Sequence, residues 1–158
     1  MSDSRVTHDR PFRILAVASG GGHWAQLMRI KPALEGYDVV YATVDPANRR
    51  DVAGCPFHTI PDGNLSTKLA LLVVALRLWV LVRRVRPQVV ISTGAAPGYF
   101  ALRFASRLGA RSLWLDSIAN AGTLSVSGRH VRSCTDAWLT QWRQLETPTG
   151  PFYEGRIL

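Results

Sequence analysis

Short apolar runs alternate with longer, helix-like segments along this sequence of 158 residues. Each run ends at small or polar residues, which is typical of strands buried on both faces of a parallel sheet. The runs cover residues 13–18, 37–45, 56–61, 88–93, 111–117 and 136–142. The alternation predicts an α/β fold, a single Rossmann-like domain with a parallel sheet and right-handed crossovers.

Helices are predicted between these strands. Apolar spacing indicates one over 23–34, and Ser66 or Thr67 is expected to cap a long helix that ends near residue 86, before Pro87. Segment 97–109 has proline near its start and glycine at its end, as helices often do, and 125–134 is also expected to be helical. Residues 1–11 are polar and expected to be flexible, 12–158 form the domain, and the last residues are expected to be extended or loose.

The formal net charge of +8 favours anionic partners. Only Lys31 and Lys68 are lysines, so 17 of the 19 basic residues are arginines. They form no long basic run or nucleic-acid-binding motif, so we expect a phosphorylated or membrane-borne substrate and no nucleic acid. Cys55 and Cys134 lack the spacing of metal ligands and are expected to be buried thiols, with no metal and no cofactor. No secretory signal opens the chain, so the expected location is cytoplasmic.

A glycine-rich turn follows the first predicted strand, at Ser19, Gly20, Gly21, Gly22 and His23. Parallel α/β sheets bind ligands at the carboxyl ends of their strands, and a helix N-terminus after a glycine turn favours a phosphate. His23 could act there as a general base on a sugar hydroxyl, or it could form a hydrogen bond to the phosphate of an acceptor substrate. The alternative is a structural imidazole that caps the helix or packs on the next residue.

The same turn also fits a dinucleotide site. Gly20, Gly22 and Ala25 satisfy the GxGxxG/A pattern, and Asp45 ends the second predicted strand where a ribose-binding acid would lie. The bulky pair His23 and Trp24 would crowd a pyrophosphate, and the length leaves no room for a substrate domain. Dinucleotide binding is therefore the weaker alternative.

Three further strand ends carry small or polar residues: Thr93 with Gly94, Asp116 with Ser117, and Gln141 with Trp142. The first pair opens a second helix and could bind an anion, or it could be an ordinary tight turn. An acid at the second position could orient a hydroxyl or a histidine, or cap a loop. A tryptophan at the third could stack on a sugar or a partner subunit. Together the four strand ends favour a binding cleft.

The long helix is apolar on almost every face, interrupted by Arg77 and closed by Arg83, Arg84 and Arg86. Its apolar stretch is shorter than the ~20 residues that span a bilayer. It is either a core helix with a basic end or a helix that packs on the domain with one side and on an anionic membrane surface with the other.

Four stretches carry a resemblance that extends over nearly the whole chain from residue 13; in order they are ASGGGHWAQLMRIKP, VVISTGAAPG, WLDSIANAGTLSVSGR and TDAWLTQW. The sequence thereby resembles the acceptor-side glycosyltransferase subunits of bacterial capsule and exopolysaccharide synthesis. These are related to the eukaryotic membrane subunit of the UDP-N-acetylglucosamine transferase that forms dolichol-linked chitobiose. It is also similar to the N-terminal half of the lipid-linked N-acetylglucosaminyltransferase of peptidoglycan synthesis.

The resemblance implies half of a GT-B enzyme whose other half, a separate catalytic chain, binds the UDP-sugar. A glucuronosyl, galactosyl or N-acetylglucosaminyl group would pass to a polyprenyl-pyrophosphate-linked saccharide at the cytoplasmic face of the inner membrane, with arginines near the loops holding the pyrophosphate. A non-catalytic role, recruiting the partner to the membrane, is the alternative. His23 and Asp116 are the catalytic candidates implied. The substrate-binding candidates are Ser19, Gly20, Gly21, Gly22, Thr93, Gly94, Ser117, Ser125, Gly128, Gln141 and Trp142. The family usually has glutamate at position 116 and a basic residue near Asn120, so this chain departs from the family pattern at two positions that bear on acceptor recognition.

Overall fold

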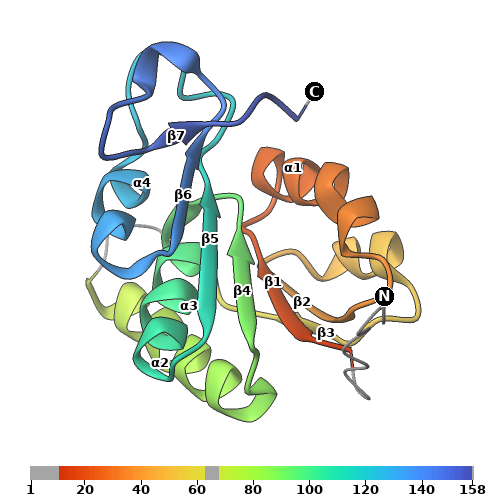
Figure 1. The fold of residues 1–158 in the computed structure, drawn as a ribbon. Coiled ribbons are helices and arrows are strands. Elements are labelled where there is room, and N and C mark those ends of the chain that lie inside the picture. Colours follow the sequence, from red (N-terminus) through yellow and green to blue (C-terminus); the bar gives the residue numbers. More distant parts are fainter. Residues whose placement is uncertain (1–10, 63–67, 158) are drawn as a thin grey trace, which may run out of the picture.

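The computed structural model describes residues 11–62 and 68–157. Seven parallel strands form one sheet in the order β3-β2-β1-β4-β5-β6-β7 (Figure 1). The strands are β1 (Arg13–Val17), β2 (Asp38–Thr43), β3 (Phe57–Thr59), β4 (Val89–Ser92), β5 (Arg111–Leu115), β6 (Ala137–Thr140) and β7 (Phe152–Tyr153). The predicted fold class, a Rossmann-like α/β domain with a parallel sheet, is confirmed.

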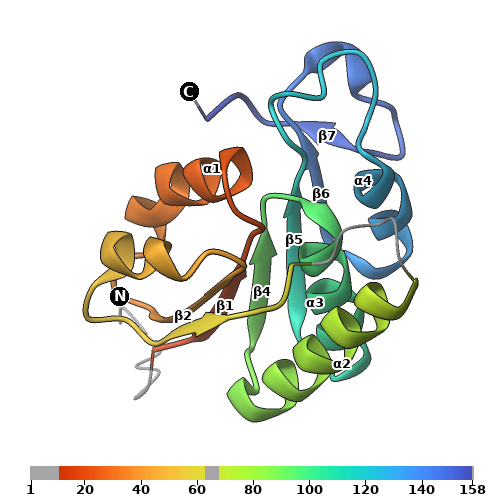
Figure 2. The same cartoon turned by 180° about the vertical axis from the view of Figure 1, so that it is seen from behind.

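Helices cover both faces of the sheet. The α-helices are α1 (Gly22–Ile30), α2 (Lys68–Val85), α3 (Ala95–Arg107) and α4 (Val126–His130). Short 3-10 helices are η1 (Lys31–Leu34), η2 (Pro46–Val52), η3 (Val131–Cys134) and η4 (Arg143–Leu145). Figures 1 and 2 show α1 on one face, and α2 with α3 on the other.

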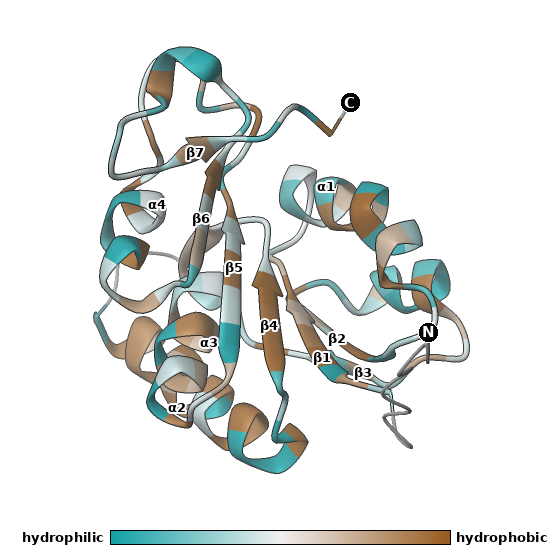
Figure 3. Ribbon diagram, in the orientation of Figure 1, coloured by the Kyte–Doolittle hydropathy of each residue, from teal (hydrophilic) through white to brown (hydrophobic). Residues whose placement is uncertain are grey.

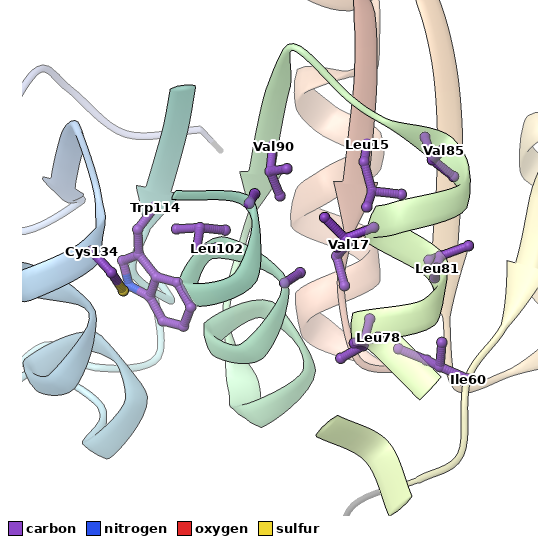
Figure 4. Close-up of a cluster of buried hydrophobic side chains, with 14 of the residues drawn as sticks. Leu15, Val17, Ile60, Leu78, Leu81, Val85, Val90, Leu102, Trp114 and Cys134 are labelled. Atoms are coloured by element: carbon purple, nitrogen blue, oxygen red, sulfur yellow. The ribbon is translucent and has the colours of Figure 1, made fainter. Parts of the chain in front are cut away.

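Side chains alternate along the strands, so the central strands β1, β2, β4 and β5 contribute to two separate cores, one on each face of the sheet. Leu15 and Val17 of β1 point toward α2 and α3, where Leu78 and Leu102 join them in one buried cluster (Figure 4). The intervening residues of β1 point to the other face and pack with Trp24 and other side chains of α1. Strands β1, β2 and β4 are thus buried from both sides, as their unbroken apolar runs predicted, whereas the edge strands β3 and β7 are partly exposed.

The structure differs from the sequence-based expectations at a few places. Helix α3 begins at Ala95 rather than at Pro97, because the chain turns directly from β4 into the helix with positive φ angles at Gly94 and Ala95. The C-terminal segment, expected to be extended or loose, includes a seventh strand, Phe152–Tyr153, paired with β6. A 3-10 helix over Pro46–Val52 was not predicted. The expected helix caps Ser66 and Thr67, and residues 1–10 of the segment expected to be flexible, lie outside the described residues.

Candidate functional site

The carboxyl ends of β1 and β4 lie side by side at the centre of the sheet, where the strand order reverses direction. Open α/β sheets bind ligands at this switch point. A cleft of about 400 Å³ lies here. Its walls come from the turn after β1, the start of α3, and the loop after β5 with the start of α4. The lining residues are Ser19, His23, Asp62, Ala95, Ala96, Pro97, Ser117, Ala119, Asn120, Ser125, Val126 and Ser127.

His23 is half-buried in this cleft and is held by the turn after β4. Its Nδ1 lies 2.9 Å from the carbonyl oxygen of Thr93, and the Thr93 hydroxyl donates to the carbonyl of His23 at 2.7 Å. A carbonyl oxygen only accepts hydrogen bonds, so Nδ1 carries the proton of the neutral ring. Nε2 is then an acceptor, and no hydrogen bond to it comes from the described residues. The ring is therefore oriented as a general base would be.

Gly94 makes room for that ring. Its φ of 137° is one that side-chain-bearing residues rarely adopt, and a Cβ there would overlap Nδ1 and Cε1 of His23. The next residue, Ala95, is a non-glycine with a φ of 66°. Such conformations cost about 1–3 kcal/mol and persist where the surrounding structure enforces them. The turn after β4 is thus shaped to bring the start of α3 against His23.

Asp116 lies behind the cleft wall and is only 1% exposed. Its Oδ1 accepts from the indole N–H of Trp114 at 3.1 Å and from the Ser125 hydroxyl at 2.6 Å. Its Oδ2 accepts from the backbone N–H of Ser125 at 3.1 Å and from the Asn120 side chain at 3.2 Å. A Cβ on Gly128 would overlap Oδ1. The carboxylate therefore fixes the loop after β5 onto the sheet and has its lone pairs occupied.

Gln26 joins the strand ends beneath the cleft, a role that the sequence-based interpretation missed. Its Nε2 donates to Ser117 Oγ at 3.1 Å, and its Oε1 accepts from the N–H of Ile118 at 3.2 Å and from Gln141 Nε2 at 2.6 Å. Gln141, fully buried, also donates to the carbonyl of Asp116 and accepts from the N–H of Ile157. The one available signal was position: Gln26 lies one helical turn after Gly22, on the side of α1 that meets the sheet edge.

Trp142 is also engaged by the protein itself. Its indole N–H donates to the carbonyl of Ile118 at 2.8 Å, and the guanidinium of Arg156 lies 4.2 Å from its ring centroid. Arg156 in turn donates to the carbonyl of Gln141. Trp142 thus joins the C-terminal segment to the loop after β5, and it does not line the cleft.

Two helix N-termini frame the cleft. Neither α1 nor α3 has a side-chain cap or an acidic residue in its first turn. An anion is favoured at such termini. At α3 the donors are limited to Ala95 and Ala96, because the Gly94 N–H donates to Ser92 Oγ at 3.2 Å and Pro97 has no N–H. By contrast, the start of α4 is capped by Ser125 Oγ, which accepts from the N–H of Gly128 at 2.8 Å. In the described ranges no arginine or lysine lines the cleft, so the expected arginines near the pyrophosphate do not lie in its walls.

The structure brings together the predicted residues from all four strand ends but gives them different surroundings. Ser19, His23, Ser117 and Ser125 line the cleft. Gly21 and Gly22 are exposed at the start of α1, with Gly20 beside them. Buried behind or beneath the wall are Thr93, Asp116, Gly128 and Gln141. Asp45, considered for a ribose, is exposed and accepts from the N–H of Ala47, which caps η2.

The groups with shifted pKa values lie away from the cleft. Burial, aided by the neighbouring Cys55, raises the pKa of Tyr41 to about 12. Burial also raises the pKa of the Cys134 thiol, against a smaller opposing effect of Arg103. In the part of the chain that the structure describes, no three His, Cys, Asp or Glu side chains are grouped so as to hold a metal ion.

At the level of sequence, no protein-family profile matches this chain, and neither does any curated protein. Its fold does match solved structures. MurG of Acinetobacter baumannii superimposes with a TM-score of 0.67 at 15% identity, over 92% of this chain and 44% of MurG. UDP-N-acetylglucosamine 2-epimerase of Rickettsia bellii gives 0.66 at 10% identity, over 85% and 40% of the two chains. A glycosyltransferase of Rickettsia africae gives 0.53 at 13% identity, over 78% and 34%.

This chain spans less than half the length of each of these proteins. At such low identity the likeness shows the fold alone. The chain has the fold of one Rossmann-like half of a GT-B protein, as seen in MurG and the epimerase.

Proposed function

We propose that this chain is the acceptor-binding half of a two-chain inverting glycosyltransferase. A separate chain would bind a UDP-sugar, and this chain would present a polyprenyl-pyrophosphate-linked saccharide to it. The observation that carries the proposal is His23, whose ring is oriented in a cleft at the switch point of a GT-B half. The resemblance read in the sequence supports the assignment to exopolysaccharide synthesis, and the N-terminal half is the one that it implies.

The chemistry assigned to His23 is proton removal. Nε2 of the neutral ring accepts the proton of the acceptor hydroxyl while the oxygen forms a bond to the anomeric carbon of the donor sugar. The bond from that carbon to the UDP oxygen breaks, and UDP leaves with the electron pair. The carbonyl of Thr93, already bonded to Nδ1–H, stabilises the imidazolium that results. Asp116, with its oxygens occupied by four donors, fits the role of a positioning residue better than that of a base.

The pyrophosphate is assigned to the uncapped N-termini of α1 and α3. Neither helix start has a side-chain cap, His23 of α1 and Ala95 of α3 line the cleft, and anions are stabilised at such termini. The glycines before α1 allow close approach of a phosphate to the backbone. In this arrangement the helix starts bind the pyrophosphate at the cleft, whose described lining contains no arginine.

Membrane association is assigned to the outer side of α2. Leu69, Leu72, Val73, Leu76 and Val80 are exposed there at helical spacing, and α2 stands out as apolar in Figure 3. Arginines on the same helix would meet anionic headgroups. Within the described ranges, no helix is long and apolar enough to cross a membrane. The proposed location is the cytoplasmic face of the inner membrane.

The test is reconstitution with the product of the neighbouring gene. The two chains are expected to co-purify and to transfer sugar from a UDP-sugar to a lipid-linked acceptor. His23→Ala should abolish transfer and leave partner binding unchanged. Unchanged transfer by His23→Ala would instead favour the recruiting role, for which the apolar stripe on α2 is the supporting observation. Calorimetric binding of NAD or NADP would revive the dinucleotide alternative.

A further inference from the structure

A second hollow adjoins the cleft and differs from it in chemistry. It encloses about 330 Å³ between α2, α3 and α4, within the size range of small-molecule sites. Its walls are formed mainly by Leu71, Tyr99, Phe100 and Val126, with His130 at one side. Tyr99 and Phe100 pack edge to face, with ring centroids 5.5 Å apart. We call this hollow the aromatic groove.

The aromatic groove is continuous with the cleft that holds His23. Ala96, Val126 and Ser127 line both. Ala96 belongs to the first turn of α3, whose uncapped N–H groups are assigned to the pyrophosphate. A molecule with its anionic group at this helix start can therefore extend an attached chain directly into the groove.

The other side of the groove meets the proposed membrane-facing helix. Leu71 lies on α2, next in sequence to Leu72, which is 64% exposed on the outer stripe. The lining of the groove thus reaches from the first turn of α3, past the aromatic side chains, to α2, the helix that carries the exposed apolar residues on its outer side. None of the groove residues described carries a carboxylate, a guanidinium or an ammonium group.

We infer that the aromatic groove binds the isoprenoid units nearest the pyrophosphate of the acceptor. This inference rests on the proposed function, since it takes the pyrophosphate position from it. The groove would hold the chain where it leaves the bilayer and so fix the distance of the saccharide from His23. Aromatic and aliphatic walls suit a branched, unsaturated hydrocarbon, which gains affinity in proportion to its buried area.

The test is calorimetry on the full chain with inorganic pyrophosphate and with dimethylallyl, geranyl and farnesyl diphosphate. We expect all four to bind and affinity to rise with chain length. Geranyl diphosphate should bind about tenfold more tightly than pyrophosphate, the effect of roughly two buried methylene groups. The double variant Leu71→Ser/Tyr99→Ser, at two residues that line the groove but not the cleft, should lose this gain and keep the affinity for pyrophosphate, which also reports that it is folded.

Leu72→Ser is the matched control, because Leu72 neighbours Leu71 on α2 but does not line the groove. It should keep the dependence on chain length. Pyrophosphate binding without that dependence would overturn the groove assignment and leave the proposed function standing. Two other results would also overturn the groove assignment. One is that Leu72→Ser loses the gain in affinity with chain length while the double variant keeps it. The other is that dihexanoylphosphatidic acid shows an equal gain in affinity over pyrophosphate. Failure of all four ligands to bind would overturn the assigned pyrophosphate site as well.

Discussion

Gly94→Ala is expected to displace His23 from the cleft without unfolding the domain. The structure gives two reasons. Gly94 has a φ of 137°, and a Cβ added to it would occupy the space of the imidazole atoms Nδ1 and Cε1. The backbone around it is held by the pairing of β4 with its two neighbours and by the start of α3, so the ring must move.

The expected fall in the free energy of unfolding of Gly94→Ala is the sum of two costs. An alanine in this backbone conformation costs about 1–3 kcal/mol, and loss of the bond from Nδ1–H to the Thr93 carbonyl costs about 0.5–1.5 kcal/mol. We therefore expect the free energy of unfolding to fall by about 2–4 kcal/mol. Gly36→Ala is the matched control: its φ is 87°, with no atom within 4 Å of an added Cβ. It should cost only about 1–2 kcal/mol, the backbone term alone.

Urea unfolding gives the stability of both variants, and long-range ¹H–¹⁵N correlation spectra report the protonation of each histidine nitrogen. In the unaltered protein His23 should carry its proton on Nδ1. Gly94→Ala should lose that signature and the transfer activity of the reconstituted pair, whereas Gly36→Ala should keep both. The reasoning would be refuted by a Gly94→Ala protein that retains the Nδ1–H tautomer and is no less stable than Gly36→Ala.

Three other changes test separate parts of the structure. Asp116→Asn places an amide nitrogen, itself a donor, among the four donors that the carboxylate accepts from. It should lower the free energy of unfolding, measured in urea, by about 1–3 kcal/mol. Unchanged stability would contradict the role of the carboxylate in fixing the loop after β5. Tyr41 should ionise only near pH 12, seen by its ultraviolet absorbance. Because its pKa in the folded protein lies above the ordinary 10.0, its contribution to stability is complete below pH 10 and is lost as the pH rises toward 12. Leu72→Asp/Leu76→Asp should reduce binding to anionic vesicles about tenfold in a flotation assay, with less than about 0.5 kcal/mol change in unfolding; undiminished binding would argue against the proposed membrane-facing side of α2.

The layered α/β fold could be predicted because its signals are local. Unbroken apolar runs mark strands buried on two faces, and the segments between them are long enough for crossover helices. The seventh strand was missed because it has two residues, Phe152–Tyr153, too few for any periodicity. The early start of α3 was missed because it depends on a positive φ at Ala95, a conformation that alanine does not signal.

The position of the cleft could also be predicted, because the carboxyl ends of parallel strands meet at one edge of the sheet. The contacts within it could not. His23 is fixed by a carbonyl 70 residues away, and Gln26 bonds to Gln141 across 115 residues. Every residue has a backbone carbonyl, so the sequence does not indicate which carbonyl a histidine will bind.

His23 and Asp116 were equivalent candidates in the sequence, but the structure shows that they differ in burial and in hydrogen bonding. His23 and Asp116 both follow strands at the same edge, and either could have been the base. A base must reach a substrate hydroxyl and have a lone pair to accept its proton. His23 meets both conditions, since it lines the cleft with Nε2 unengaged by described residues, whereas Asp116 is 1% exposed and accepts four hydrogen bonds. Asp116 can still affect the proposed transfer, because Ser125, Asn120 and the loop they shape form one wall of the cleft. Its substitution should therefore alter acceptor binding more than the pH dependence of transfer, while substitution of His23 should alter the rate of transfer itself.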